Sequence, residues 1–495
     1  MIVKRQRWQA RQLSQAQIDS AGSRQLAVLD SLLREHRLQL AATDSTPLRL
    51  ALLAKISNRE QEQAALLNRV LRSEGIGWLG ENPFPLKEFR QSLSRRNEIA
   101  VSFFVGDSTT LVFLIAADTL VARPVAIGRQ ELEKKLLNIH QGITTGADSL
   151  SNQSAAFDTS TAHHVYRLLL QEVLAGRKET ALALVPDDVL HALPFEALVT
   201  EAAPNRRVRF LIERFAVRNG VSLAELQQEE EEQWSVRSFL LAAAPALKPA
   251  RLDATVTRRN ARWWRGPVGE LEARMIRALV RCNTDMTGAQ LSRAALLPAM
   301  NQSDWLHLAS HSLGSSGEPL FSEIILSIPP GQDEPERLYA FEIFQMSLPA
   351  RMAILSGCET VRGTFVASEG FEGFVQAFRA AGTPSIIASL WKVDDAATAA
   401  FFEFYYKALG EGQSSVRALQ TAKLKMLNHP NYTFANWAAF SYYGRDWRVE
   451  LPRPWTWQEW ALLLAGIALL LLAGGMLIWQ WRRNAKRSLL QVEPL

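Results

Sequence analysis

Hydrophobic and polar positions along the chain change their pattern twice. Over residues 1–78, apolar residues recur every three or four positions, as in LAVLDSLLREHRLQLAA and EQEQAALLNRVLRSEG, which predicts amphipathic helices. A helix start signal at residues 44–47 (DSTP) separates the two segments. We expect this helical region to dock on the rest of the chain, on a regulator or on a second copy, because its apolar faces have no core of their own.

Strand-like and helix-like patterns alternate from residue 79 onward. In residues 79–235 the segments IAVSFFVG and TLVFLIAA flank the turn residues 106–108, which predicts a hairpin, and two helices and a short buried strand follow. In residues 236–448 the strand-like segments SFLLAAAP, DWLHLAS, ARMAILSG and PSIIASLW alternate with amphipathic helices. Repeated β–α units of this kind imply a largely parallel sheet flanked by helices, and therefore an α/β fold.

A long apolar segment follows a short linker at residues 449–459. Within residues 460–481 the run WALLLAGIALLLLAGGMLIW contains no charged residue, is long enough to cross a bilayer as one helix, and has tryptophans at both ends. A buried core helix is the alternative. The length of the run and the basic tail at residues 482–495 favour a single transmembrane helix near the C-terminus, with the lipid bilayer as a partner.

Two opposing signals bear on the orientation of this predicted anchor. The tail carries Arg482, Arg483, Lys486 and Arg487, and the positive-inside rule would keep it in the cytosol and place the preceding residues outside. The N-terminal sequence MIVKRQRWQARQLSQ, however, lacks the apolar stretch of a signal peptide that could direct export. We weigh the missing signal more heavily and predict that the main domain is cytoplasmic.

Composition narrows the possible functions. The formal net charge is +5, but the basic residues are scattered and form no recognisable nucleic-acid module, so we expect no nucleic-acid partner. The sequence contains no GxxxxGK[ST] loop, which argues against a nucleotide-binding protein of that class. The two cysteines, Cys282 and Cys358, are too few for a disulfide framework or for a zinc site on their own.

Two strand-like segments run into residues that could perform nucleophilic chemistry. DWLHLAS leads to His311 and RMAILSG leads to Cys358, and parallel strands bring their carboxyl ends to the same edge of a sheet. A histidine there could activate a thiol, and backbone N–H groups after the strands could bind an oxyanion. From spacing alone, a core cysteine and a satisfied histidine remain the commoner interpretation. We expect Cys282 to be a packed small residue and His307 to belong to the core rather than to support a site.

An ordered series of motifs in this region resembles the CHAT family, the caspase-like domain found behind tetratricopeptide repeats in bacteria and related to separase. The series covers residues from about 80 to 447 and comprises VPDDVLHALPFEAL (185–198), the helix at 270–280, WLHLASH, ILSGCET, SEGFEGFVQAFRAAGTPSIIASLWKVDDAATAAFFEFYY and WAAFSYYG. The resemblance implies a caspase-like catalytic half at residues 236–448, preceded by a degenerate caspase-like half at residues 79–235.

The resemblance also implies roles for individual residues. His311 stands at the position of the family's catalytic histidine and Cys358 at that of its nucleophile, with the backbone N–H groups of Ser312 and Cys358 as the oxyanion hole. Ser312 departs from the glycine usual in the family, and its Cβ restricts φ. Gly357 replaces a usual alanine, which is a milder departure. By similarity to separase, an acidic wall for an arginine at the P1 position of the substrate is expected from Asp395, Asp394 and Glu359, with Glu369 as a further candidate.

The function implied by these observations is that of a membrane-anchored cysteine endopeptidase. It would cleave protein substrates after a basic residue through an acyl-enzyme, and the chemistry requires no metal or cofactor. The alternative is a catalytically silent caspase-like scaffold that binds partners at a membrane. The retention of both His311 and Cys358 favours the enzyme.

Overall fold

The described part of the protein consists of several long stretches separated by short gaps. This computed structural model describes residues 20–41, 84–147, 157–201, 207–227, 233–247, 269–313, 319–332, 334–359, 367–391 and 393–454, with scattered positions between 43 and 66 and between 465 and 479.

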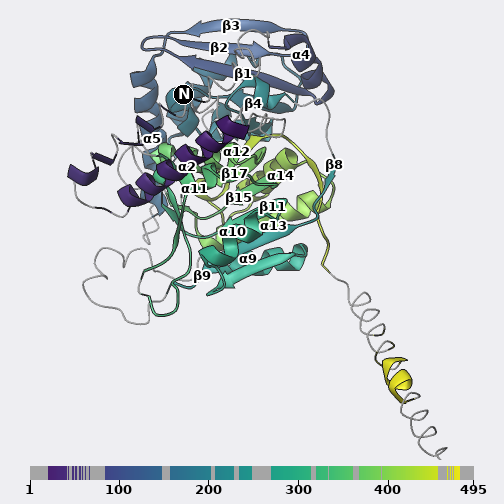
Figure 1. The fold of residues 1–495 in the computed structure, drawn as a ribbon. Coiled ribbons are helices and arrows are strands. Elements are labelled where there is room, and N and C mark those ends of the chain that lie inside the picture. Colours follow the sequence, from purple (N-terminus) through teal and green to yellow (C-terminus); the bar gives the residue numbers. More distant parts are fainter. Residues whose placement is uncertain are drawn as a thin grey trace, which may run out of the picture.

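One eleven-stranded sheet runs through the molecule in the order β10-β9-β11-β15-β17-β18-β7-β4-β1-β2-β3 (Figure 1). Its strands are β1 (Glu98–Val105), β2 (Thr110–Ile115), β3 (Leu120–Val125), β4 (Ala181–Val185), β7 (Ala216–Asn219), β9 (Phe239–Pro245), β10 (Thr284–Gly288), β11 (Trp305–Ala309), β15 (Met352–Leu355), β17 (Ser385–Ser389) and β18 (Phe440–Gly444). Seven of its ten neighbouring pairs are parallel; only β17–β18, β1–β2 and β2–β3 are antiparallel. The predicted α/β fold with a largely parallel sheet is therefore confirmed.

Helices cover this sheet on both faces. Every residue of β11, β15, β17 and β18 is buried, and successive side chains of a strand point to opposite faces, so neither face is open there. The helices are α2 (Ser20–Ala41), α4 (Leu86–Arg95), α5 (Arg129–Ala147), α6 (Thr159–Tyr166), α7 (Leu223–Leu226), α9 (Glu270–Leu279), α10 (Arg293–Met300), α11 (Ala340–Phe344), α12 (Ala367–Ala380), α13 (Asp395–Gly410), α14 (Ser415–Leu427) and α15 (Phe434–Trp437), with a π-helix, η1 (Arg167–Gln171), and short 3-10 turns, η2 (Asp188–Ala192), η3 (Phe195–Ala197), η4 (Leu211–Glu213) and η5 (Pro319–Phe321). Two further small pairings join β5 (Val199–Glu201) to β6 (Arg209–Phe210) and β8 (Gln233–Ser235) to β19 (Arg448–Glu450).

The two predicted halves share this one sheet. Strand β18, at the end of the second half, lies between β17 and β7, and β7 belongs to the first half. Arg218 of β7, 1% exposed, donates to both carboxylate oxygens of Glu98 in the same half at 2.6 and 2.9 Å, and across the junction to the Gly444 carbonyl at 3.0 Å. A second buried ion pair joins Lys423 Nζ to Glu196 Oε1 at 2.9 Å. The halves are thus joined by main-chain and side-chain contacts in a common core.

The segment at residues 185–198 is part of this joint. It turns through η2 and η3, and Glu196 of η3 is the partner of Lys423 in α14. His140 of α5 contacts the Ala192 carbonyl through Nε2 at 2.9 Å. Burial lowers the pKa of His191 to about 4, with Arg379 acting in the same direction and Asp187 opposing it. The imidazole of His191 is therefore neutral at physiological pH.

This depressed pKa makes the folded protein sensitive to mild acid. Because the pKa of His191 is lower in the folded than in the unfolded chain, its full contribution to stability is present above about pH 6.5 and is lost as pH falls toward 4. The loss from this group amounts to at most about 3 kcal/mol. We expect urea unfolding at pH 7.5 and pH 5 to show a smaller pH dependence in the His191→Gln variant than in the wild type. Identical pH dependence in the two proteins would contradict the assignment.

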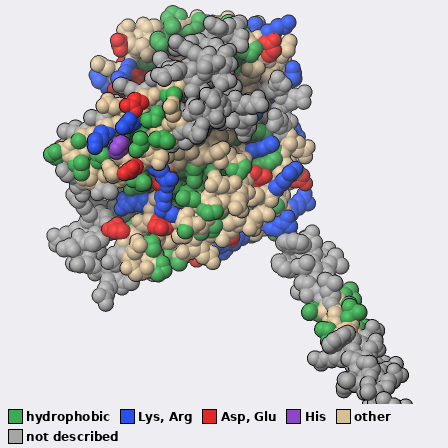
Figure 2. Space-filling model, viewed as in Figure 1, with side chains coloured by type: hydrophobic (Ala, Val, Ile, Leu, Met, Phe, Trp, Pro, Cys, Tyr) green, Lys and Arg blue, Asp and Glu red, His purple; other side chains and the backbone are tan. Residues whose placement is uncertain are grey.

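The N-terminal helix α2 docks on the second half, one of the outcomes expected from its pattern. Leu33 and Leu40 are fully buried in a small cluster that Phe321 of η5 also packs against. Arg37 is buried with its guanidinium 5.9 Å from the Phe341 ring centre, and Figure 1 shows α2 crossing close to α11. On the face shown in Figure 2, charged side chains of both signs are interspersed with apolar ones.

Most of the predicted transmembrane segment, residues 460–481, lies outside the described residues, as does the basic tail. Within the described part of the chain, no helix has both the length and the apolar character needed to cross a membrane. The positions that are described include a helical stretch at residues 473–479, where Met476, Leu477 and Ile478 are 57–66% exposed.

Candidate active site

A second, four-stranded sheet carries the predicted dyad. Its order is β14-β13-β12-β16, with β12 (Ser312–Leu313), β13 (Glu323–Ile325), β14 (Arg337–Tyr339) and β16 (Cys358–Glu359). Strand β12 continues from β11 through Ser310 and His311, and β16 continues from β15 through Ser356 and Gly357. The two short strands pair in parallel, Ser312 with Cys358 and Leu313 with Glu359.

The backbones of His311 and Cys358 therefore lie close together, directly after the carboxyl ends of the adjacent parallel strands β11 and β15. His311 is 6% exposed, and its carbonyl accepts a hydrogen bond from Ile325 N at 2.8 Å. For Cys358 and Glu359 the described part is the backbone; the side chains lie outside it. Through the pairing of Ser312 with Cys358, the structure brings together the segments that carry His311 and Cys358, which are 47 residues apart in sequence (358 minus 311).

Gly357 makes this close approach possible. A Cβ at position 357 would lie 1.6 Å from the Ser310 carbonyl oxygen and 3.0 Å from the Ser310 nitrogen. Real Cβ atoms do not approach backbone atoms below 3.0 Å, so in this geometry the position accepts only glycine. Gly357 stands where the family usually has alanine, and the sequence indicated only a mild departure. In this structure the glycine is required, because there is no space for a Cβ.

Gly357→Ala is expected to displace the strand end that leads to Cys358. Backbone surrounds the new methyl group and cannot yield as a side-chain tip could, so we expect a loss of about 1–3 kcal/mol in unfolding free energy and slower alkylation of Cys358. Thermal unfolding and the rate of iodoacetamide labelling measure the two effects. Gly410→Ala is the matched control, because a Cβ there meets no atom within 4 Å. If Gly357→Ala and Gly410→Ala showed the same stability and the same labelling rate, the steric explanation would be contradicted.

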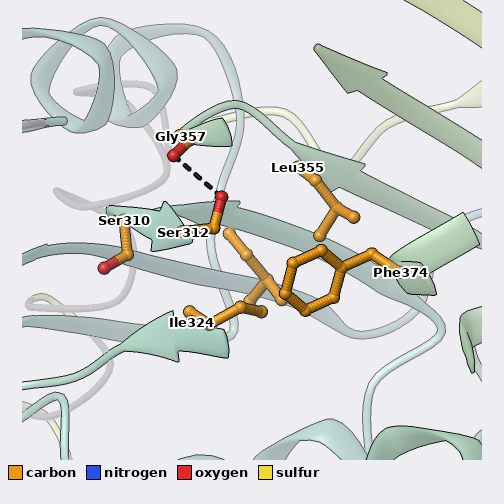
Figure 3. Close-up of a pocket in the computed structure, with 7 residues that line it drawn as sticks. Ser310, Ser312, Ile324, Leu355, Gly357 and Phe374 are labelled. Carbon is orange, nitrogen blue, oxygen red and sulfur yellow. Dashed lines mark hydrogen bonds between the residues drawn. The ribbon is translucent and has the colours of Figure 1, made fainter. Parts of the chain in front are cut away.

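Ser312 is tied to Gly357 by two hydrogen bonds. Both the Ser312 N–H and the Ser312 hydroxyl donate to the Gly357 carbonyl at 2.9 Å, the second bond being drawn in Figure 3. The residue is not among those with positive φ, so its Cβ causes no backbone strain. The Ser312 N–H, which was predicted for the oxyanion hole, is part of the β12–β16 ladder. An oxyanion would have to replace the Gly357 carbonyl as the acceptor of this hydrogen bond.

A small cavity lies directly behind these strand ends. Its volume is about 10 Å³, and it is lined by Leu308, Ser310, Ser312, Ile324, Leu355, Gly357 and Phe374. Figure 3 shows Phe374, Leu355 and Ile324 closing the side opposite the Ser312–Gly357 contact. Such a volume holds about one water molecule, which is far too little for an arginine side chain. This cavity is therefore not a pocket for a P1 residue.

A buried polar network lies beneath the site. His307 in β11 is fully buried; its Nδ1 lies 2.8 Å from Tyr406 Oη and its Nε2 2.7 Å from Glu272 Oε1. The second oxygen of Glu272 accepts from the Ser356 hydroxyl at 2.9 Å. His307 is thus a core residue, as predicted, but it is connected to the turn before Cys358. Glu272 was missed by the sequence reasoning, although an acidic residue on the apolar face of the helix GELEARMIRAL, next to Ala273 and Ile276, was the available signal.

Comparison with known proteins decides the family. The sequence profile of the CHAT domain matches residues 159–445, more than half of the chain. The chain belongs to the CHAT family. The caspase-like nature of this family agrees with the mixed α/β architecture and with the position of His311 and Cys358 at neighbouring strand ends.

Two curated relatives of this CHAT protein are much longer than the chain itself. Human tetratricopeptide repeat protein 28 is 25% identical over 364 residues, covering 62% of this chain and 14% of that protein, and the mouse protein is 24% identical over 362 residues with the same coverage. The chain therefore spans 14% of the length of these curated relatives. Two crystal structures of the separase–securin complex of Saccharomyces cerevisiae align with 74% and 73% of this chain and 31% of theirs, at 11% and 12% identity and TM-scores of 0.43 and 0.44.

The acidic residues predicted to bind a P1 arginine lie at the same edge of the CHAT sheet. Asp394 and Asp395 follow β17, the neighbour of β15, and Glu359 lies in β16 beside Leu313. The Asp394 side chain caps α13 by accepting from Ala397 N at 2.9 Å. Asp395 is half-buried in the first turn of α13. Glu369 belongs to the first turns of α12, and its side chain lies outside the described part.

Cys282 has the properties of a packed thiol. It is half-buried, and burial raises its pKa to about 12, with Asp285 acting in the same direction and Arg277 opposing it. A thiol with this pKa is almost wholly protonated at neutral pH and is a poor nucleophile. Within the described residues, no group of three or more His, Cys, Asp or Glu side chains is arranged to hold a metal ion.

A larger hollow of the CHAT protein lies elsewhere. It has a volume of about 540 Å³ and is lined by Arg123, His164, Arg167, Leu168, Gln171, Glu172 and Ala175. These residues come from β3, at one end of the sheet order, and from the α6–η1 segment, whereas β11 and β15 are the third and fourth strands from the other end. The larger of the two cavities is therefore far from His311 in the order of the sheet.

Proposed function

We propose that this protein is a cysteine endopeptidase in which Cys358 is the nucleophile and His311 the general acid and base. The observation that supports this most strongly is the parallel pairing of Ser312 with Cys358, directly after His311. In this pairing the backbones of a histidine and a cysteine from separate segments are neighbours, which supports a thiolate–imidazole pair. The thiolate attacks the scissile carbonyl, and His311 protonates the departing amine. Water, deprotonated by His311, then hydrolyses the acyl-enzyme.

The test of this proposal is chemical labelling of the full-length protein. An acyloxymethyl ketone that ends in arginine should modify the wild type, and peptide mapping by mass spectrometry should locate the adduct on Cys358. Pre-treatment with iodoacetamide should prevent the modification. An adduct on Cys282, or no adduct under conditions that label a control cysteine peptidase, would argue against the enzyme.

The preference for a basic P1 residue is proposed for Asp395. Its carboxylate, half-buried at the edge that carries Cys358, would pair with a guanidinium or ammonium group. We expect Asp395→Ala to reduce kcat/KM for P1 arginine or lysine peptides by about 2–5 kcal/mol in transition-state free energy, and to affect neutral P1 residues much less. Glu403→Ala, which removes a carboxylate of the same helix that pairs with Lys407, is the matched control. A peptide library that favours aspartate or an apolar residue at P1 would overturn this part of the proposal.

A scaffold without catalysis is the second candidate, and one observation favours it. The Ser312 N–H is engaged by the Gly357 carbonyl, so one predicted oxyanion donor is not directed at a substrate. A protein that remains unlabelled by the arginine probe, yet whose Cys358 reacts with iodoacetamide, would support the scaffold. Labelling of Cys358 by the probe supports the enzyme.

The membrane anchor at residues 460–481, with the catalytic domain in the cytoplasm, is also part of the proposal. It is supported by twenty uncharged residues in sequence and by the exposed apolar side chains among the described positions of this segment, which are Leu469, Leu471, Met476, Leu477, Ile478 and Trp479. Addition of protease to spheroplasts tests the orientation. Digestion of the domain while a cytosolic marker survives would place the domain outside, and recovery of the full-length protein in the soluble fraction would remove the anchor. The proposed partners are a protein substrate, and a regulator or second copy bound through the N-terminal helices.

A further inference from the structure

Glu272 connects the two strands that lead to His311 and Cys358. Its Oε1 lies 2.7 Å from His307 Nε2 in β11, and its Oε2 accepts from the Ser356 hydroxyl at 2.9 Å, in the turn after β15. His307 is four residues before His311, and Ser356 is two residues before Cys358. A single carboxylate, 3% exposed, therefore contacts β11 at its middle residue and the turn that follows β15.

One assignment of donors gives every polar atom of this network a partner. Trp305 Nε1, which can only donate, donates to Tyr406 Oη at 3.3 Å, and the Tyr406 hydroxyl donates to His307 Nδ1 at 2.8 Å. Burial holds the pKa of Tyr406 well above its ordinary value, which keeps that proton in place. The imidazole then donates through Nε2 to Glu272, and Ser356 donates to the other oxygen. Each of these buried polar atoms has a partner, which is the condition under which such a network rigidifies a core.

Helix α9 is held close enough to the strands for Glu272 to reach them. Gly269, which precedes the helix with φ of +86°, would place a Cβ 2.6 Å from the Ala309 carbonyl oxygen at the end of β11. The first turn of α9 therefore lies against the end of the strand that leads to His311. Ala273 and Ile276, both fully buried, pack the same helix face.

We propose that Glu272 is a positioning residue for the Cys358–His311 pair. This inference rests on the proposed peptidase function. The two oxygens of Glu272 fix the turn at Ser356 and Gly357 relative to β11, so that the backbone of Cys358 stays beside His311. The role depends on acceptor geometry and not on the negative charge.

The decisive comparison is between two buried serines. Ser356→Ala removes the bond to Glu272 and leaves the rest of the network intact. Ser303→Ala is the matched control, because Ser303 is 1% exposed, its hydroxyl donates to the Ala299 carbonyl at 2.8 Å, and it precedes β11 at the end opposite to His311. Both variants are made in the full-length protein and compared for thermal unfolding, peptide kinetics and amide hydrogen exchange of peptides covering residues 352–359.

We expect Ser356→Ala to lower kcat by about 10- to 100-fold with KM changed less than about twofold, because a displacement of about 1 Å at a reacting atom has this effect. Hydrogen exchange at residues 356–359 should be faster, while the melting temperature should change no more than in Ser303→Ala. Glu272→Gln should retain most of the activity, since its amide oxygen can accept from His307 and its NH₂ group can donate to Ser356 Oγ. Glu272→Ala, which has neither atom, should not.

Two results would overturn the inference: Ser356→Ala indistinguishable from Ser303→Ala in both kinetics and local exchange, or Glu272→Gln as impaired as Glu272→Ala. Failure of the peptidase proposal has a different signature. If the wild type neither cleaves peptides nor reacts with the arginine probe, the proposal of a peptidase fails. Amide hydrogen exchange at residues 356–359 then decides by itself whether Glu272 positions this turn.

Discussion

Cys358→Ala is expected to eliminate peptide cleavage and probe labelling while the protein stays folded. Removal of the nucleophile from a comparable triad lowers kcat by roughly 10⁴-fold or more, so the residual rate should fall to the background of the assay. The loss is measured with a fluorogenic peptide that ends in arginine, and folding is checked by thermal unfolding. The substitution removes a single sulfur atom, which is a small change in side-chain volume.

Cys282→Ala is the matched control for this experiment. The thiol of Cys282 has a pKa raised to about 12 and lies outside the ladder that joins β12 and β16, so its removal should leave cleavage and labelling unchanged. Full activity in Cys358→Ala, or loss of activity only in Cys282→Ala, would refute the assignment of the nucleophile.

Arg218→Met is expected to cause the largest loss of stability in the described part of the chain. Burial alone would raise the pKa of Glu98, but Arg218 and Arg96 hold it below its ordinary value, so its carboxylate is charged inside the core. Methionine fills much of the space but leaves this charge with fewer partners and deprives the carbonyls of Gly444 and Leu226 of a donor. Removal of one member of such a buried pair lowers the unfolding free energy by about 3–5 kcal/mol.

Urea unfolding measures this effect. Arg209→Met is the control, since Arg209 is 56% exposed and pairs with Glu213 at 3.0 Å on the surface. Pairs of this kind contribute at most about 1 kcal/mol. If the two variants lost the same amount of stability, the buried junction between β7 and β18 would not have the importance assigned to it.

The alternation of strands and helices predicted that His311 and Cys358 each follow a parallel strand and therefore lie at one edge of the sheet. That β11 and β15 are neighbours, and that Ser312 pairs with Cys358, is information from the structure. The alternation also does not reveal that Gly357 must lack a Cβ, because the obstructing atom is the carbonyl of Ser310, 47 residues earlier (357 minus 310) and brought close only by the fold.

Other features depended on tertiary contacts in the same way. The second of the two helices predicted between the hairpin and the short buried strand corresponds to HHVYRLLLQEVLAG (163–176), whose pattern is that of one helix. The structure changes from α6 to the π-helix η1 at Arg167, because hydrophobic spacing does not distinguish the two helix types over a single turn. Glu272 looked like an ordinary charged helix residue. Its function in the network depends on His307 and Ser356, which lie 35 and 84 residues away in sequence.

The junction between β7 and β18 has a consequence for synthesis on the ribosome. Arg218 meets the Gly444 carbonyl across 226 residues of sequence, so the edge of β7 has no strand beside it until the end of the domain has been translated. At roughly 5–20 residues per second, this interval lasts about 10–45 s. During that time the nascent chain presents an open sheet edge of the kind that pairs with other chains. Production of this protein should therefore depend on chaperone capacity and translation speed more strongly than its final stability would indicate.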